Sequence, residues 1–127
     1  MVLHVVHDPG DAPGYYQVKG RRKQLRRLED VAAEMLVAFM GEAEKRHPHQ
    51  RALEQADHKL VVGLPVTRTL EVVEQIGPRL LVMGSEGRTG LSRLLLGSKA
   101  EQLVRLCPVP VVIVKTPGER DPEPRPE

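Results

Sequence analysis

Four short apolar runs are separated along the chain by longer amphipathic or polar segments. Such runs, rich in Val, Leu and Ile and bounded by turn residues, predict β-strands. The predicted strands lie near residues 2–6, 59–63, 80–84 and 111–114. The third run is apolar without alternation, which is typical of a strand that is buried on both faces of a parallel sheet.

The longest segment between two runs predicts a helix over Arg21 to Arg46, which ends at His47-Pro48. Its apolar residues recur at steps of three and four, as they do on one face of an amphipathic helix. The residues that this spacing assigns to one inward stripe are Leu25, Leu28, Ala32, Met35, Phe39 and Ala43.

Two further helices are predicted from their start and stop signals. One begins near Pro65 and stops at Gly77-Pro78; the other begins at Ser98 and ends at Cys107-Pro108. The segment Ser98 to Glu101 matches a capping box, which predicts Ser98 as the N-cap and Glu101 reaching back to it. The residues expected to point inward from the first of these helices are Leu70, Val73 and Ile76.

This order, β-α-β-α-β-α-β, predicts an α/β fold. Strands that alternate with helices form an open, mostly parallel sheet with right-handed crossovers and helices on both faces. We expect one domain over residues 1–115. The remaining segment, Thr116 to Glu127, is rich in Pro and charge and predicts a disordered tail.

Composition narrows the class of protein. The chain has 127 residues, 40% of them apolar, and a net charge of only +2, so charge gives no reason to expect nucleic acid as a partner. No apolar run approaches the length of a membrane span. A single cysteine, Cys107, and the absence of a signal peptide predict a cytoplasmic protein. The histidines show no metal-site spacing, so we expect no protein-bound metal.

The segment Gly84 to Ser98 is the most informative part of the sequence. It follows a buried strand and leads into a helix, which is the edge of an open α/β sheet where ligands bind. Glycines let a backbone approach a phosphate closely, and the N–H groups of a helix start favour an anion. The order Gly97-Ser98-Lys99 is not a Walker A motif, and the Gly-x-Gly-x-x-Gly fingerprint of dinucleotide sites is absent. A loop whose glycines serve only turns and capping is the structural alternative.

At these residues the sequence resembles the universal stress protein family, in particular its ATP-binding subclass. That subclass carries Gly-x2-Gly-x9-Gly-Ser/Thr, and Gly84, Gly87, Gly97 and Ser98 match this spacing without a gap. The resemblance extends over about Val2 to Lys115. It implies a fold that is universal stress protein-like, that is, adenine nucleotide alpha hydrolase-like.

The resemblance implies a function and a set of residues. We expect a non-enzymatic, nucleotide-binding stress-response protein that takes ATP or AMP, with Mg²⁺ as the accompanying ion; a weak ATPase stays open. The implied nucleotide-binding residues are Gly84, Gly87, Arg88, Gly97, Ser98 and Lys99. The implied positions near the base are Val5, Val6 and Leu64. The alternative is a dimerising interaction module that has lost nucleotide binding.

The chain departs from the family at its start, because family members begin with one more strand and helix. In the family's sheet order this missing strand is central, so the sequence predicts an N-terminally shortened form. A miscalled start, a truncated chain and a genuine short form all remain open. By resemblance we expect a homodimer that pairs the last strand, Pro110 to Lys115. We also expect uncovered apolar surface beside the helix Arg21 to Arg46.

Overall fold

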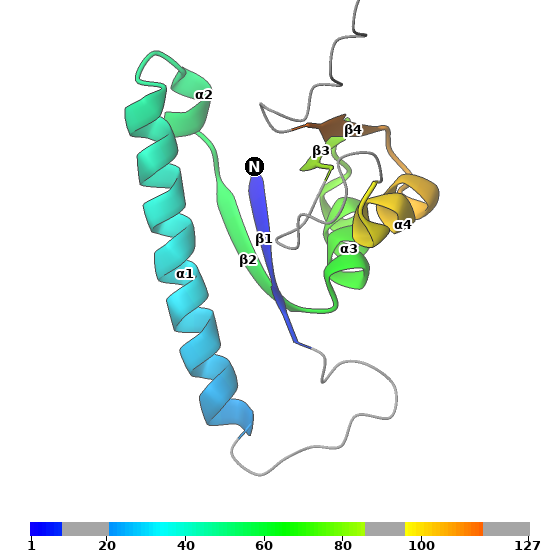
Figure 1. Ribbon diagram of the computed structural model, residues 1–127, viewed down its shortest axis with the longest axis horizontal. Coiled ribbons are helices and arrows are strands. Elements are labelled where there is room, and N and C mark those ends of the chain that lie inside the picture. The colour runs from blue at the N-terminus through cyan, green and yellow to red at the C-terminus, as the bar shows by residue number, and fades with distance from the viewer. Residues whose placement is uncertain (9–20, 86–95, 116–127) are drawn as a thin grey trace, which may run out of the picture. The chain divides into compact units, whose positions relative to one another are not determined.

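The computed structural model describes residues 1–8, 21–85 and 96–115 (Figure 1). Its strands and helices follow the predicted order, and every strand begins and ends within about one residue of its prediction. The elements are β1 (Val2–His7), α1 (Arg21–Arg46), α2 (Arg51–Glu54), β2 (His58–Gly63), α3 (Pro65–Ile76), β3 (Leu81–Gly84), α4 (Ser98–Leu106) and β4 (Val111–Val114). Only the four-residue α2 was not predicted. The predicted tail, 116–127, lies outside the described residues.

The described strands form two parallel pairs, β1 with β2 and β3 with β4. Parallel pairing joined by helical crossovers confirms the predicted α/β class. The chain divides into two compact units, Met1–Thr69 and Leu70–Glu127, and each unit contains one of the two pairs.

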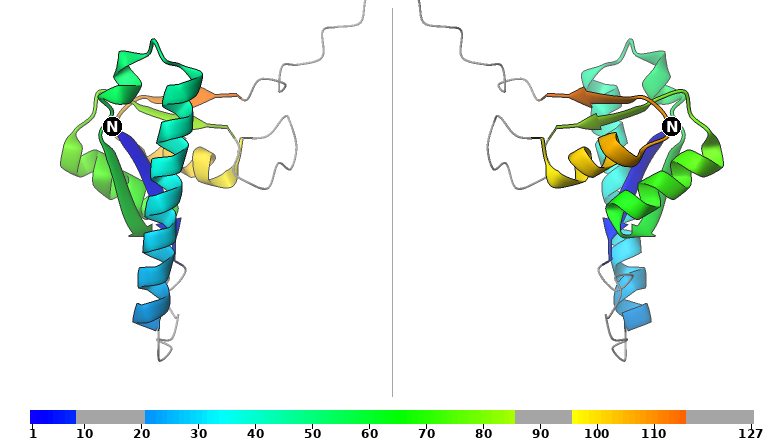
Figure 2. Two further views of the ribbon diagram at one scale, coloured as in Figure 1. Left: turned by 90° about the vertical axis from the view of Figure 1, so that its left-hand side faces the viewer. Right: turned by 90° about the vertical axis from the view of Figure 1, so that its right-hand side faces the viewer.

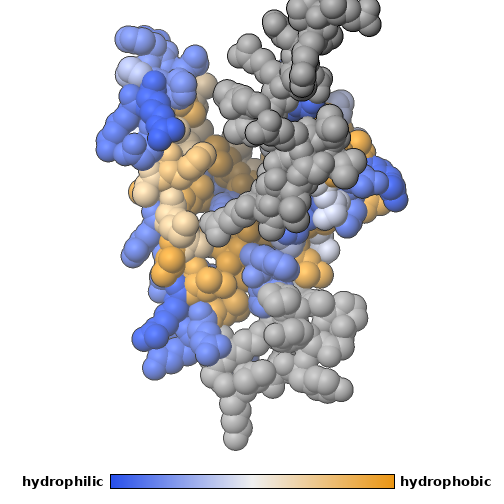
Figure 3. Space-filling view, in the orientation of Figure 1, coloured by the Kyte–Doolittle hydropathy of each residue, from blue (hydrophilic) through white to orange (hydrophobic). Residues whose placement is uncertain are grey.

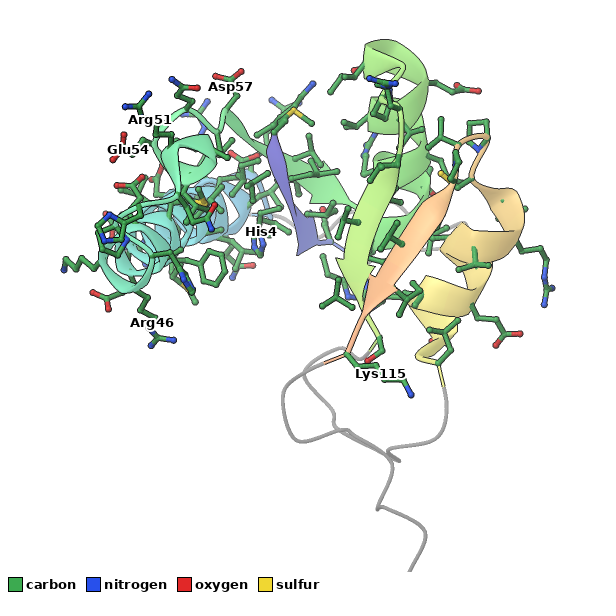
Figure 4. The ribbon with its side chains drawn as sticks, turned by 90° about the horizontal axis from the view of Figure 1, so that it is seen from above. His4, Arg46, Arg51, Glu54, Asp57 and Lys115 are labelled. Carbon is green, nitrogen blue, oxygen red and sulfur yellow. The ribbon has the colours of Figure 1, made fainter. Side chains whose placement is uncertain are left out.

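The first unit contains the β1–β2 pair, the long helix α1, which contacts both strands, the short α2 and the start of α3. Figure 2 shows the two strands lying side by side. The pair is in register from Val2 opposite His58 to His7 opposite Gly63. The Asp8 N–H extends the pairing by donating to the Gly63 carbonyl oxygen at 3.0 Å. His4 lies on the side of β1 that faces α1 (Figure 4).

The second unit contains β3, β4, α4 and most of α3. Val82 lies opposite Val112 and Gly84 opposite Val114 in the parallel register. Helix α3 ends where predicted, because Gly77 adopts a positive φ of 59° and donates its N–H to the Val73 carbonyl oxygen at 2.9 Å. A residue in the left-handed region after the last turn is a common helix stop, and glycine adopts it without strain.

The predicted inward stripe of α1 is wrong at half of its positions. The residues that the helix buries are Ala32, which was predicted, and Leu36 and Met40, which were not, at 7%, 7% and 6% exposure. Three members of the predicted stripe, Leu28, Met35 and Phe39, are exposed instead. Nearly every position from Val31 to Met40 is apolar, so the spacing alone could not decide which side of the helix meets the sheet.

Two other burial predictions are also wrong. Strand β3 is not buried on both faces, because Val82 is 55% exposed while Leu81 and Met83 are half-buried. Ile76, expected to point inward from α3, is 46% exposed, whereas Val73 is buried as predicted and Val72 is buried beside it. In both elements, more large apolar side chains are present than the surrounding residues bury.

Candidate functional site

The end of β3 and the start of α4 are joined by one backbone hydrogen bond. The Gly97 N–H donates to the Ser85 carbonyl oxygen at 3.0 Å. The Ser85 N–H in turn donates to the Val114 carbonyl oxygen at 3.0 Å, which ties this point to the end of β4. The predicted glycine-rich segment therefore begins and ends at one place, at the carboxyl edge of the β3–β4 pair.

Helix α4 begins differently from the predicted capping box. Its N-cap is Gly97, with φ −58° and ψ 148°, and no described side chain caps the helix. Ser98 is the first helical residue, and the carboxylate of Glu101 accepts a hydrogen bond from Arg105 at 3.1 Å instead of reaching back. The Ser85 hydrogen bond explains the shift, because it holds Gly97 in the extended backbone that an N-cap requires.

The first turn of α4 presents its backbone donors at this edge. Helix geometry leaves the N–H groups of Ser98, Lys99 and Ala100 without an acceptor inside the helix. The side chains of Ser98 and Lys99 are exposed, so the Lys99 ammonium adds positive charge beside the N-terminus of the helix dipole. Ala100 and Leu103, at 3% and 5% exposure, anchor the helix from its other side. This arrangement favours a bound anion.

Gly84 is the last residue of β3 and is exposed beside this point. Its backbone does not take a positive φ, and neither does that of Gly97, so neither glycine is required here for a left-handed conformation. What these two glycines contribute is therefore space, because neither has a side chain to fill the region beside its backbone. The structure thus brings together Gly84, Gly97, Ser98 and Lys99. Gly87 and Arg88, the remaining predicted phosphate residues, lie outside the described residues.

The three residues expected near a base lie in the first unit. Val6 is buried at 6% exposure, Val5 is half-buried beside it on β1, and Leu64 follows β2. The hydrogen bond from Asp8 to Gly63 puts Val6 and Leu64 at the same carboxyl edge of the β1–β2 pair. The residues predicted near the base therefore lie in the first unit, and the described phosphate-site residues lie in the second.

Sequence reasoning missed one residue at the edge of the first unit. The Arg68 Nε donates to the Val62 carbonyl oxygen at 2.8 Å, so this arginine lies partly buried against the end of β2. Its position three residues after Pro65, in the first turn of α3, is the only signal in the sequence that could have indicated it.

Two kinds of feature are absent from the described residues. No helix among them is long and apolar enough to cross a membrane. Within the same ranges, no group of three or more His, Cys, Asp or Glu side chains could hold a metal ion. Cys107 is half-buried just after α4.

Comparison with known proteins decides the family. The model of the universal stress protein family matches residues 1–115. This chain belongs to the universal stress protein family. The match covers all of the described residues and includes both edges described above.

Individual universal stress proteins are similar over shorter stretches. The chain is 41% identical over 59 residues, 46% of its length, to universal stress protein MJ0531 of Methanocaldococcus jannaschii. It is 33% identical over 95 residues, 74% of its length, to universal stress protein Rv1996 of Mycobacterium tuberculosis. These alignments span only 35% and 28% of the two relatives.

Solved structures agree with the fold. The chain matches the structure of MJ0577 from Methanocaldococcus jannaschii with a TM-score of 0.53 and 25% identity, covering 91% of this chain and 74% of that one. It matches universal stress protein UspA of Lactobacillus plantarum with a TM-score of 0.51 and 21% identity, over 88% and 74% of the two chains. Both likenesses support a universal stress protein fold.

Proposed function

We propose that this universal stress protein binds ATP or AMP, with Mg²⁺, and works as a non-enzymatic sensor or regulator in the cytoplasm. The phosphates bind at the segment from Gly84 to Ser98, mainly through backbone N–H groups. The proposed contacts include Gly87 and Arg88 of the same segment, and Val5, Val6 and Leu64 of the first unit are the proposed neighbours of the base.

The hydrogen bond between Gly97 and Ser85 is the observation that carries this proposal. It fixes the N-terminus of α4 at the carboxyl edge of β3, next to the exposed Gly84, and the first turn also carries the exposed Lys99. Charge-assisted hydrogen bonds from several backbone N–H groups are the usual means of holding a phosphate. The spacing Gly-x2-Gly-x9-Gly-Ser, which the chain shares with the ATP-binding subclass it resembles, supports the same proposal.

A sensor is favoured over an ATPase by the side chains at this edge. Hydrolysis needs groups that hold Mg²⁺ and that position the attacking water. The segment from Gly84 to Ser98 holds one acid, Glu86, and in the first turn of α4 the carboxylate of Glu101 is paired with Arg105. A single acid gives little support for a hydrolytic site, so binding without turnover is the proposed role.

Nucleotide carried through purification tests this function. The protein is purified without added nucleotide and denatured by heat, and the supernatant is separated by ion-exchange chromatography. The proposal expects ATP or AMP in the supernatant of the wild-type protein and a loss of it from Gly97→Val. A Gly41→Val variant serves as the matched control, because a side chain at Gly41 on α1 meets nothing within 4 Å. Equal nucleotide from both variants would contradict the site.

A second candidate function is that of a dimerising interaction module, and β4 favours it. In the described residues β4 pairs only with β3, and its Val112 and Val114 are 44% and 52% exposed. A short apolar edge strand without charge readily pairs with another strand. The proposed homodimer joins two copies of Pro110 to Lys115 in antiparallel fashion.

Sedimentation separates the two functions. A module that acts by dimerising is a dimer at micromolar concentration and carries no nucleotide, whereas the sensor carries nucleotide whatever its oligomeric state. A single 14 kDa species with native circular dichroism would refute the β4 dimer. It would leave the proposal of nucleotide binding unaffected.

A further inference from the structure

Arg68 joins the first turn of α3 to the end of β2. Its Nε donates to the Val62 carbonyl oxygen at 2.8 Å, and the side chain is partly buried there. Its backbone N–H donates to the Leu64 carbonyl oxygen at 2.9 Å, so the residue is also part of the hydrogen bonding of the helix. Both contacts lie inside the first unit.

The Val62 carbonyl lies on the outer side of β2, away from β1. The Asp57 and Gly63 carbonyl oxygens accept hydrogen bonds from β1 and from the residue after it, at 2.7 and 3.0 Å. Successive residues of a strand direct their backbone groups alternately to its two sides, so the odd-numbered residues of β2 face β1. The backbone groups of Leu60 and Val62 therefore face the opposite side.

This outer side of β2 is a strand edge. Among the described residues, β2 pairs with no strand except β1. Helix α1 packs across the face of the pair, because it contacts both strands. An edge with unpaired N–H and C=O groups is a template for pairing with another chain, and proteins protect such edges with charged side chains or with other cover.

A sharp turn at Gly63 brings Arg68 back to this edge. Gly63 is buried and has a φ of 142°, a conformation that glycine adopts without strain and other residues rarely adopt. Helix α3 begins at Pro65, directly after this turn, so its first turn lies beside the strand that it follows. The backbone at Gly63 thus makes the contact between Arg68 and Val62 possible.

The Arg68 guanidinium occupies an acceptor that a neighbouring strand would need. A hydrogen bond from a charged donor is stronger than one between neutral groups. A strand that added to β2 would have to displace the guanidinium from the Val62 carbonyl oxygen. If that strand were the same edge of a second copy, two arginines would also meet, and like charges across strands are destabilising.

Strand β4 differs from β2 in this respect. Its four residues carry no charge, and Val112 and Val114 are 44% and 52% exposed. The chain therefore has one edge strand whose composition suits pairing and another along which an arginine is bound.

We infer that Arg68 closes the outer edge of β2 to strand pairing, so that copies of this chain do not associate through β2. The excluded partner is an extended strand, above all the same edge of a second copy, because a surface that pairs with itself is the commonest way in which oligomers form. This role is independent of nucleotide binding, and every contact behind it lies in the first unit.

Arg68→Met tests the role by removing the donor while keeping a long, unbranched side chain. Light scattering at high micromolar concentration measures the mass of the assembly, and circular dichroism checks the fold. A newly opened two-fold edge should raise the mass about twofold or more over that of the wild type. Arg68→Lys retains a charged donor at the edge and should leave the mass unchanged. The apolar surface along the middle of α1, which Figure 3 shows, is common to all variants and does not alter the comparison.

The matched control is Arg105→Met. Arg105 also donates one side-chain hydrogen bond, to the Glu101 carboxylate at 3.1 Å, but it is exposed on α4 and touches no strand edge through that bond. Its replacement should leave the mass at the wild-type value.

A second variant shows whether the new contact uses β2. Leu60→Pro removes an N–H that faces the outer edge and leaves the hydrogen bonds to β1 in place, since proline is tolerated in an edge strand where its nitrogen faces away from the partner. Alone it should have the wild-type mass. Combined with Arg68→Met it should return the mass to the wild-type value.

Several results would overturn the inference. One is a wild-type mass for Arg68→Met with native circular dichroism, and another is an equal rise for Arg68→Lys or for Arg105→Met. A raised mass that persists when Leu60→Pro is added would place the new contact elsewhere. Loss of native circular dichroism in Arg68→Met would assign Arg68 to the stability of the first unit and would also overturn the edge role.

Discussion

Gly97 donates its backbone N–H to the Ser85 carbonyl oxygen at 3.0 Å, so the N-cap of α4 is held at the end of β3. This contact sets the position of the first-turn donors of α4 relative to the strand edge. The proposed phosphate site depends on it, and so do the first two predictions.

Gly97→Val should abolish nucleotide binding. The branched side chain occupies the space that a phosphate needs beside the first turn of α4, and valine is also a poor N-cap. Isothermal titration with ATP and Mg²⁺ measures the effect, and circular dichroism verifies the fold. Gly41→Val, on a helix face with open space, is the control that should bind as the wild type does. Retained binding by Gly97→Val would place the phosphates elsewhere.

Ser98→Ala should weaken binding only modestly. Ser98 is exposed in the first turn and is not the N-cap, so its hydroxyl contributes one hydrogen bond while the backbone donors remain. The loss of one such bond corresponds to about 1 kcal/mol, or roughly fivefold in Kd. An alanine that lowers thermal stability sharply would instead indicate a capping role, which the structure assigns to Gly97.

The sequence predicted well where the helices and strands begin and end, but it predicted poorly which side of each one is buried. Turn signals such as Gly77-Pro78 determine where a chain stops, and this information is local. Which side of α1 is buried depends on what packs against it, and a stretch from Val31 to Met40 that is apolar at every position but Glu34 does not encode that. The exposed Phe39 and the buried Met40 therefore could not be told apart.

The candidate site was also predicted only in part, because its strand and helix boundaries are local features of the sequence and its contacts are not. The glycine spacing located Gly84, Gly97 and Ser98 at one edge, because strand and helix boundaries are readable from sequence. The N-cap was misassigned by one residue, since the bond from Gly97 to Ser85 is a contact between residues twelve apart. Arg68 was missed because an arginine in a first helical turn has many possible roles.

Two glycines should respond oppositely to alanine. Gly41 lies inside α1 with room for a side chain, so Gly41→Ala should stabilise the protein by about 0.5–1 kcal/mol. Gly77 has a φ of +59°, where a side chain is strained, so Gly77→Ala should destabilise it by about 1 kcal/mol. Chemical denaturation with urea compares the free energies of unfolding. Changes of the same sign in both variants would contradict the assigned conformations.

A lysine on β4 should break the proposed edge pairing. Val112 is 44% exposed, so Val112→Lys leaves the interior of its own unit undisturbed, whereas Ile113→Lys would put a charge at a half-buried position. Lysine on an edge strand opposes pairing with another strand. Sedimentation should show a lower mass for Val112→Lys than for the wild type. An unchanged mass would show that β4 takes no part in the assembly.

Nucleotide binding by the wild-type chain is the central claim, and calorimetry tests it most directly. Titration of millimolar ATP and Mg²⁺ into the purified, nucleotide-free protein should give a saturable heat with one site per chain. AMP should compete for the same site, because it shares the ribose and the first phosphate. The absence of any heat at millimolar ATP, from protein with native circular dichroism, would contradict the account and leave the interaction module as the function of this chain.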